Sequence, residues 1–345
     1  MALLWSDGFD KYSSTGADLN IRYTRSATAI SVNTTGGVTG GGAAISSDGV
    51  SRRLEAAFTS AHGATETIRA AFWFRSAISA GTFFRIGTNQ QALNSSFAPG
   101  INMLVDGSVS VTIHGGTTVL ATSAAGVIIA NQYHHIEYAG RYRDSGGSIV
   151  VKVDGVTVIN FSGDANTGTQ PTSIVGVCPF WSDSSNRFDD LLVWDDAGSD
   201  FTSALSVLHQ IETLDVDADD SVQFTPLSST NTSNVDDATF HDGDTTYNES
   251  ATVGHVDLFT VEDQATTPAN TLAVVVHTRA KKTDAGSAVL RNRLVVGATT
   301  SEGSDNTLTT SYTHKQDAWG KNPSTSAAWS NTDVNSIKSG YEFQA

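Results

Sequence analysis

The stretch SIVVKVDGVTVINF, residues 148–161, constrains the fold of this chain more than any other segment. Two runs rich in β-branched residues flank the dipeptide Asp154-Gly155. Both central residues of a type I′ turn adopt positive φ, so Asp-Gly at this spacing predicts a tight β-hairpin. The chain is therefore expected to pair antiparallel strands here.

Alternation with a period of two predicts further strands from about Ile68 onward. In TIRAAFWFRS (67–76) one face carries Ile68, Ala70, Phe72 and Phe74, and the other face carries Arg69, Trp73 and Arg75; SVSVTIH (108–114) alternates in the same way. Gly115-Gly116 predicts a second hairpin. The runs TLAVVVHTRA (271–280) and AVLRNRLVVGA (288–298) predict a third, closed by a longer loop.

Composition agrees with an all-β chain. The 345 residues include 31 Gly and only 16% charged residues, a profile of short strands and polar turns. No long helix is predicted. Residues 202–214 fit either a short amphipathic helix or a strand, and we favour a strand from Ser206 onward. Residues 1–65 carry no clear pattern, so their topology is left open.

Length and charge distribution predict two domains. The chain is longer than one typical domain, and no Lys or Arg occurs from Phe188 to Thr278, where 18 acids lie. We place a concanavalin A-like sandwich at 1–205 and a smaller β-sandwich at 206–345. The net charge of −16 argues against nucleic acid as a partner, and no polybasic membrane patch is present.

The single cysteine and the N-terminal sequence bear on disulfide formation and on the compartment in which the chain is made. Cys178 is the only cysteine and lies in the apolar run IVGVCPF, so it is expected to be a buried hydrophobe, and an intrachain disulfide cannot form. The start MALLWSDGFDKY lacks the features of a signal peptide, and no apolar run is long enough to span a membrane. The expectation is synthesis in a cytoplasm without secretion.

No catalytic motif is found, and we expect no enzymatic activity. The sequence lacks GxSxG, HExxH and a phosphate-binding GxxxxGK[ST], and it has no paired-carboxylate run of the glycosidase type. His134 and His135 are adjacent, so in a strand they face opposite ways and do not predict a metal pair.

Two weak binding sites are predicted. Asp215, Asp217 and Asp219 begin like a calcium loop, but Asp220 and Pro226 stand where an EF-hand needs Gly and Glu. Calcium there is a weak candidate beside the simpler interpretation of solvated turns, and no other cofactor is predicted. A sugar site is proposed in FWSDSSNRF, with Trp181 as a stacking platform and polar partners Asp183, Asn186 and Arg187.

Two resemblances extend this interpretation. The hairpin at Val153–Val156 and the run FDDLLVWDD (188–196) resemble concanavalin A-like, or laminin-G-like, β-sandwiches. The segments at Asn234–Val261, at Arg279–Ser287 and NPSTSAAWSNTDVNSIKSGYEF (322–343) resemble tailed-bacteriophage virion structural proteins that join a lectin-like sandwich to a C-terminal domain. In that setting Trp329 is expected to anchor the terminal segment, the alternative being ligand stacking, and residues 333–338 are expected to form one helical turn or a last crossing before Gly340.

The resemblance implies a non-enzymatic virion protein on the tail, fibre, tip or baseplate of a phage or prophage, with a lectin-like jelly roll that contacts host glycan or neighbouring subunits. Its partners would be other virion proteins and further copies of itself. One alternative is a capsid decoration protein of the same fold. Another, of a different class, is a carbohydrate-binding module or an inactive glycosidase-like protein.

Overall fold

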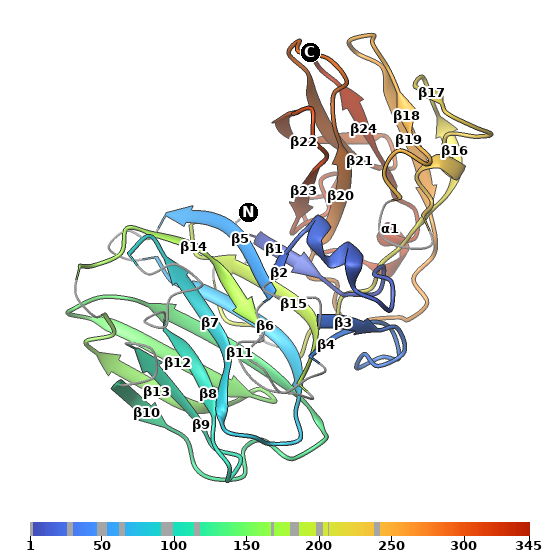
Figure 1. The fold of residues 1–345 in the computed structure, drawn as a ribbon. Coiled ribbons are helices and arrows are strands. Elements are labelled where there is room, and N and C mark those ends of the chain that lie inside the picture. Colours follow the sequence, from blue (N-terminus) through green and yellow to red (C-terminus); the bar gives the residue numbers. More distant parts are fainter. Residues whose placement is uncertain are drawn as a thin grey trace. The chain divides into compact units, whose positions relative to one another are not determined.

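The protein is described here from a computed structural model, which covers residues 3–25, 30–46, 54–61, 66–90, 99–113, 118–166, 169–179, 186–197, 203–205, 207–237 and 242–345. The chain divides into an N-terminal unit of residues 2–211 and a C-terminal unit of residues 212–345. The boundary lies six residues beyond the predicted one. Both units are built from strands, as the sequence predicts, and the only α-helix in the described part is one turn long (Figure 1).

Two antiparallel sheets form the N-terminal unit. Among the described residues, one sheet runs in the order β13-β12-β11-β6-β15-β4-β3, with β1 also paired to β15. Its strands are β1 (Leu3–Asp7), β3 (Ile30–Asn33), β4 (Ala43–Ser46), β6 (Ile68–Arg75), β11 (Tyr133–Arg141), β12 (Gly147–Val153), β13 (Val156–Gly163) and β15 (Arg187–Asp195).

The second sheet has the order β10-β9-β8-β7-β14-β5-β2 within the described ranges. Its strands are β2 (Thr24–Arg25), β5 (Leu54–Ala61), β7 (Gly81–Thr88), β8 (Gly100–Met103), β9 (Val109–Ile113), β10 (Thr118–Thr122) and β14 (Ser173–Pro179). A short 3-10 helix, η1 (Ala17–Ile21), precedes β2.

The inner faces of the two sheets meet through aromatic rings, which makes the unit a sandwich. Phe72 of β6 stacks on Phe84 of β7 at a centroid distance of 4.9 Å, and Phe74 stacks on Phe83 at 4.3 Å. The alternation predicted for residues 68–74 is confirmed, because the residues on this face are fully buried. Cys178 is also buried, as expected.

The predicted Asp154-Gly155 hairpin is confirmed. Asp154 has φ 51° and Gly155 has φ 80°, and β12 pairs with β13 on either side of them. The Asp154 carboxylate accepts the backbone N–H of His135 at 2.8 Å and lies 2.7 Å from the His134 ring. Since both bonds join the turn to β11, the turn also fixes the neighbouring strand. Gly115 and Gly116 lie outside the described residues.

The C-terminal unit has a main sheet in the order β16-β19-β24-β21-β22, counted over the residues described. Its strands are β16 (Val216–Ser221), β19 (Val256–Val261), β21 (Val289–Val296), β22 (Thr299–Thr307) and β24 (Lys338–Phe343). Two ribbons accompany it, β17 (Thr225–Pro226) with β18 (Asn248–Glu249), and β20 (Val274–Ala280) with β23 (Thr313–Trp319). Its helices are η2 (Thr232–Asn234) and α1 (Asn331–Val334).

Two strand predictions are wrong. Residues 271–280 and 288–298 do not form a hairpin, because β20 pairs with β23 while β21 pairs with β22 and β24. The two segments instead belong to different sheets that pack together, through contacts such as Thr278 with Asn292 at 2.6 Å. No strand is found at 207–215 either, and the next strand begins at Val216.

The described residues of 203–205 and 207–211 bond to side chains of the sheet rather than to a strand. Glu137 accepts the Leu205 N–H at 2.9 Å, and the Trp73 indole donates to the carbonyl of His209 at 2.7 Å. Asp190 accepts the Ile211 N–H at 3.1 Å. These partners come from β11, β6 and β15, so the segment lies across the sheet, a placement that alternation alone does not reveal.

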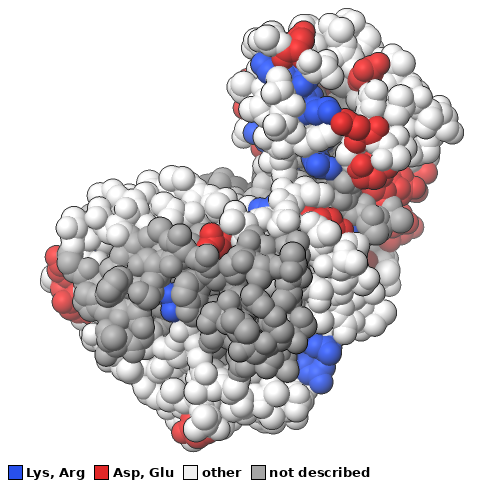
Figure 2. Space-filling view, in the orientation of Figure 1, with Lys and Arg blue, Asp and Glu red and all other residues white. Residues whose placement is uncertain are grey.

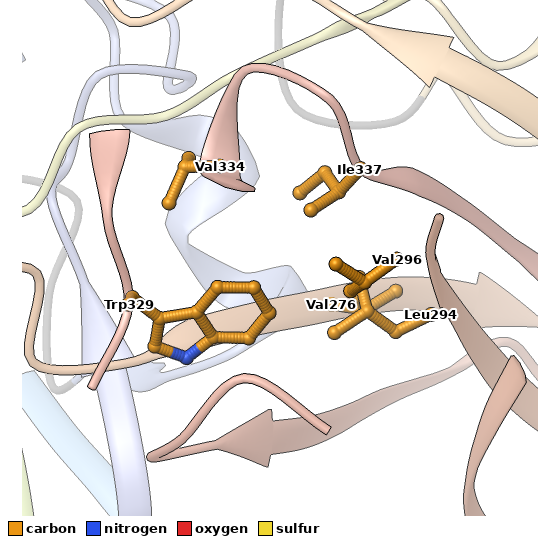
Figure 3. Close-up of a cluster of buried hydrophobic side chains, with 6 residues drawn as sticks. All are labelled: Val276, Leu294, Val296, Trp329, Val334 and Ile337. Carbon is orange, nitrogen blue, oxygen red and sulfur yellow. The ribbon is translucent and has the colours of Figure 1, made fainter. Parts of the chain in front are cut away.

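Trp329 is buried in the core of the C-terminal unit, as predicted. Figure 3 shows its ring in a cluster with the residues Val276, Leu294, Val296, Val334 and Ile337. Its indole N–H donates to the carbonyl of Trp319 at 2.8 Å. The helical turn that follows is α1, where Ser330 and Asp333 form a capping box.

Candidate functional site

The candidate site is a hollow at one end of the N-terminal sandwich. It is a shallow hollow, partly open to solvent, with a volume of about 10 Å³, room for about one water molecule, and it is lined by Thr88, Gln90, Pro99, Ile113, Tyr142, Ala165, Asn166 and Pro171. These residues come from the ends of β7, β9 and β11 and from the connections around them. Two prolines and polar amide groups thus meet where the two sheets end.

The rim of the hollow is polar and held by side-chain bonds. The Asn166 amide donates to the Asp144 carboxylate at 2.7 Å, which joins the residues after β13 to those after β11. Asn89 donates to the Thr172 hydroxyl at 2.9 Å and accepts its backbone N–H at 3.0 Å. Gln90 is exposed beside them. Hydroxyl-rich ligands bind to amides and carboxylates positioned in this way.

Tyr142 lines the hollow on the sandwich side, and Tyr138 lies behind it as its hydrogen-bond partner. The hydroxyls of Tyr138 and Tyr142 hydrogen-bond to each other, and both side chains are buried. Burial raises the pKa of each phenol well above its usual value, so both stay protonated at neutral pH. They are suited to hydrogen bonding and not to acting as a base.

A polar row crosses the outer face of the second sheet. Thr82 bonds to Asn102, and the Asn102 amide donates to Thr112 at 2.9 Å, which ties β7, β8 and β9 together. Thr112, Ser110 and Arg85 on this face are buried. Because these groups are enclosed and Asn102 bonds to both neighbours, we assign the row to the framework beside the hollow.

The predicted sugar residues are only partly placed. Trp181 and Asp183 lie outside the described residues. Asn186 is buried, and Arg187 begins β15 with its backbone paired to Arg75 and Ile45. The four-residue sugar site therefore stays a prediction, and the hollow is formed by other residues that no motif marked.

Of the acids predicted as weak calcium candidates, Asp217 and Asp219 accept hydrogen bonds through their carboxylates and Asp215 through its backbone carbonyl. Asp217 accepts the Thr260 hydroxyl, and Asp219 accepts the backbone N–H of Thr232 at 2.6 Å. The carbonyl of Asp215 accepts the Glu262 N–H at 2.9 Å. Within the described ranges, no three His, Cys, Asp or Glu side chains are grouped as metal ligands. Calcium at these residues stays a prediction.

Sequence reasoning missed a group of acids on the N-terminal unit. Asp189 accepts the Val38 N–H at 2.7 Å and Asp10 accepts the Gly42 N–H at 2.8 Å, so both bond to the same glycine-rich loop. Burial raises the pKa of Asp189 to about 7, and the Asp10 carboxylate adds to the rise. Burial also raises the pKa of Asp190 well above its usual value, with Asp189 adding to the effect.

A histidine pair lies on the same sheet. His135 Nε2 is 2.8 Å from His209 Nδ1, and His209 Nε2 is 2.7 Å from the carbonyl of Asp190. Burial lowers the pKa of His135 to about 4 and that of His209 to about 3, so both rings are neutral at pH 7. His134 bonds to Asp154 instead, which confirms that the adjacent histidines act separately.

A buried carboxylate in the segment Asn234–Val261 links several elements of the C-terminal unit. Asp257, within this segment, is fully buried and accepts the backbone N–H groups of Gln223 and Phe224 at 2.7 and 2.9 Å. Its other oxygen accepts the Asn231 amide at 2.8 Å and the Tyr341 hydroxyl at 3.2 Å. One carboxylate thus joins β19, β24 and the loop before η2.

Charged side chains of this unit pair on its surface. Arg293 pairs with Glu302 and Glu342, and Arg291 pairs with Glu302 and with Asp305. On the face drawn in Figure 2, the Lys and Arg of this unit form one group with Asp and Glu beside them. In the described part of the chain, no helix has the length and apolar character needed to cross a membrane.

Comparison with known proteins gives a likeness in structure alone. No family model and no curated protein sequence matches the chain. A Bacillus subtilis protein of unknown function with a galectin-like fold is 10% identical over 56% of this chain and 96% of its own, with a TM-score of 0.40. The carbohydrate-binding module CBM66 from Bacillus subtilis is 11% identical over 50% of this chain and 94% of its own, with a TM-score of 0.33.

The alginate lyase Aly36B is 10% identical over 56% of this chain and 96% of its own, with a TM-score of 0.39. Identities and scores this low carry no information about ligand or activity.

Proposed function

We propose that this chain is a non-enzymatic, tail-associated structural protein on the virion surface of a tailed phage, and that its N-terminal sandwich binds host-surface glycan at the hollow. The observation that carries the glycan step is the lining, which combines the amides of Gln90 and Asn166 with Tyr142 and Pro171, while Asp144 holds the Asn166 amide by a hydrogen bond. Sugars bind where amides and carboxylates are fixed beside apolar surface.

The chemistry of the hollow supports binding without turnover. The tyrosine hydroxyls beside it have pKa values raised by burial, so neither is a ready base at neutral pH. Asp144 is exposed and accepts a hydrogen bond from the Asn166 amide, an arrangement that can hold a ligand hydroxyl. The virion placement is supported by the three sequence segments that resemble phage structural proteins.

A glycan array with the full chain tests the binding step. We expect binding to bacterial surface saccharides, and at least a tenfold loss of affinity in Gln90→Ala with Asn166→Ala, because each lost hydrogen bond is worth about 1 kcal/mol. The matched control is Gln132→Ala. Gln132 is also exposed and precedes β11, whereas Tyr142 follows it, so the two ends are about 30 Å apart along the strand.

No binding to any saccharide, or equal loss in the control, would refute the glycan step. The virion step is tested separately by immunogold labelling of purified particles with an antibody to this chain. Label on the tail supports the proposal. Label over the whole head would instead identify a decoration protein, and no label on any particle would reject a virion role.

A further inference from the structure

A short segment leads from the N-terminal unit into the C-terminal unit along the chain. We call its described residues, 203–205 and 207–211, the strap. The Trp194 indole donates to the Ser203 carbonyl at 3.2 Å, and the Leu205 side chain packs against the buried cluster that contains Trp194. Side chains of the sheet thus hold the strap at its start.

The ring of His209 fixes the other end of the strap to the sheet. His209 Nε2 lies 2.7 Å from the carbonyl of Asp190, and His209 Nδ1 lies 2.8 Å from His135 Nε2. A carbonyl only accepts, so His209 carries its hydrogen on Nε2, and its Nδ1 accepts the Nε2–H of His135. Both rings are neutral in this arrangement, and their residues are only 4% and 1% exposed.

Added protons weaken this contact. A proton on His209 Nδ1 meets the Nε2–H of His135, so the pair keeps its bond only if that hydrogen moves to the other nitrogen of His135 and one positive charge stays buried. A second proton leaves two donors facing each other across 2.8 Å. When the strap leaves the sheet, both rings reach water, where histidine takes up protons readily.

We infer that the strap is an acid-sensitive connection, which leaves the sheet more readily as pH falls and so lengthens the free chain between the two units. Residues 203–211 span at most about 30 Å when fully extended, and this is the reach that opening adds. The inference does not depend on the proposed function, because the strap and the hollow share no residue.

Charged side chains of β11, β12 and the turn after β12 also face the histidine pair. Burial is the largest influence on His135 and lowers its pKa, while the Asp154 carboxylate raises that pKa and Lys152 lowers it. Lys152 is paired with Glu137 at 3.1 Å, and Glu137 accepts the Leu205 N–H at 2.9 Å. Since the two charges near His135 act in opposite directions, burial decides that the ring is neutral.

Asp190 is the acid that touches the strap from β15. Burial raises the pKa of Asp190, three neighbouring carboxylates raise it further, and the Ile211 N–H, 3.1 Å from its Oδ1, lowers it. The three carboxylates are those of Asp189, Asp10 and Asp7. Opening removes part of the cover and the Ile211 N–H together, and these two changes have opposite signs. The three carboxylates stay in place, so Asp190 offsets only part of the effect of the histidines.

Linkage gives the size of the effect. Burial lowers the pKa of His135 to about 4 and that of His209 to about 3, whereas both rings titrate near about 6.5 once the strap is open. The closed strap is therefore favoured most above pH 6.5, and less as pH falls toward the folded pKa values. From pH 7.5 to 5.5 the two histidines should raise the opening constant on the order of 100-fold.

Hydrogen exchange of the full chain measures this opening. The amides of Leu205 and Ile211 are hydrogen-bonded to the sheet in the closed strap, so their protection factors, corrected for the intrinsic exchange rate at each pH, report the opening constant. In wild type we expect these protection factors to fall at least about tenfold from pH 7.5 to 5.5, while those of β12 stay constant. No fall, or an equal fall in β12, overturns the inference, because an equal fall means that the whole unit opens.

Variants assign the effect to the histidine pair. Asp190→Asn keeps an oxygen acceptor and tolerates the φ of 51° at this position, so there the fall should reach about 100-fold. His135→Gln with His209→Gln cannot titrate, and its protection factors should not fall with pH. His134→Gln is the matched control, since His134 bonds to Asp154 instead, and it should behave as wild type. A fall that persists in the double glutamine variant would refute the histidines as the sensor.

Discussion

Replacing Trp329 with alanine should destabilise the C-terminal unit by about 4 kcal/mol. The side chain is 5% exposed, and burying roughly 200 Å² of aromatic surface at about 25 cal/mol/Å² is worth about 5 kcal/mol. Alanine retains a small part of that, and measured Trp→Ala costs of about 3–5 kcal/mol agree. The variant also leaves the Trp319 carbonyl without its donor.

Trp329→Phe separates the two contributions. Phenylalanine keeps most of the apolar contact with the cluster in Figure 3 but cannot donate to Trp319, so we expect a loss of about 1–3 kcal/mol. The order of stability should be wild type, then Trp329→Phe, then Trp329→Ala.

Urea titration with hydrogen exchange measured by mass spectrometry is the suitable assay, because the chain has two units and one spectroscopic midpoint would mix them. The free energy of opening should fall for peptides from β21 and β24. Peptides from β11 serve as the internal reference. A Trp329→Ala variant within 1 kcal/mol of wild type in β24 would refute the view that this ring anchors the terminal segment.

Two further predictions follow from the N-terminal unit. Gly155→Ala should lower stability by about 1–2 kcal/mol in a thermal or urea titration, since Gly155 has φ 80°; an unchanged stability would contradict the turn's role. Between pH 4 and 6.5 the contribution of the buried pair His135 and His209 to the free energy of unfolding should fall as pH falls, because their folded pKa values are lowered to about 4 and 3. The contribution of Asp189 should instead fall as pH rises toward its raised pKa of about 7. Relative to wild type, Asp189→Asn should therefore make the slope of unfolding free energy against pH more positive, and His209→Asn should make it more negative. Each change should be at most about 1.4 kcal/mol per pH unit. Identical slopes in all three proteins would refute these pKa shifts.

Local sequence determined the features that depend on a few neighbouring residues. The dipeptide Asp154-Gly155 fixed a hairpin because its residues tolerate positive φ, and the alternation from Ile68 to Phe74 identified the buried face of β6. The isolated Trp329 in a polar setting predicted a buried anchor, and the all-β class followed from the same patterns together with composition.

Strand pairing and the candidate site depended on the tertiary structure. β20 and β21 are adjacent in sequence, and their pattern predicts a hairpin. In the structure β20 pairs with β23 and β21 pairs with β24, so the two strands lie in different sheets. The segment 207–215 alternates like a strand, but in the folded chain it hydrogen-bonds to the side chains of Trp73, His135 and Asp190 and not to a neighbouring strand. The hollow joins the ends of β7, β9 and β11, which are far apart in sequence, so only the closed sandwich brings Gln90, Tyr142 and Asn166 together. Periodicity reports which face of a strand is buried; which strand or loop covers that face is decided by the packing of the whole chain.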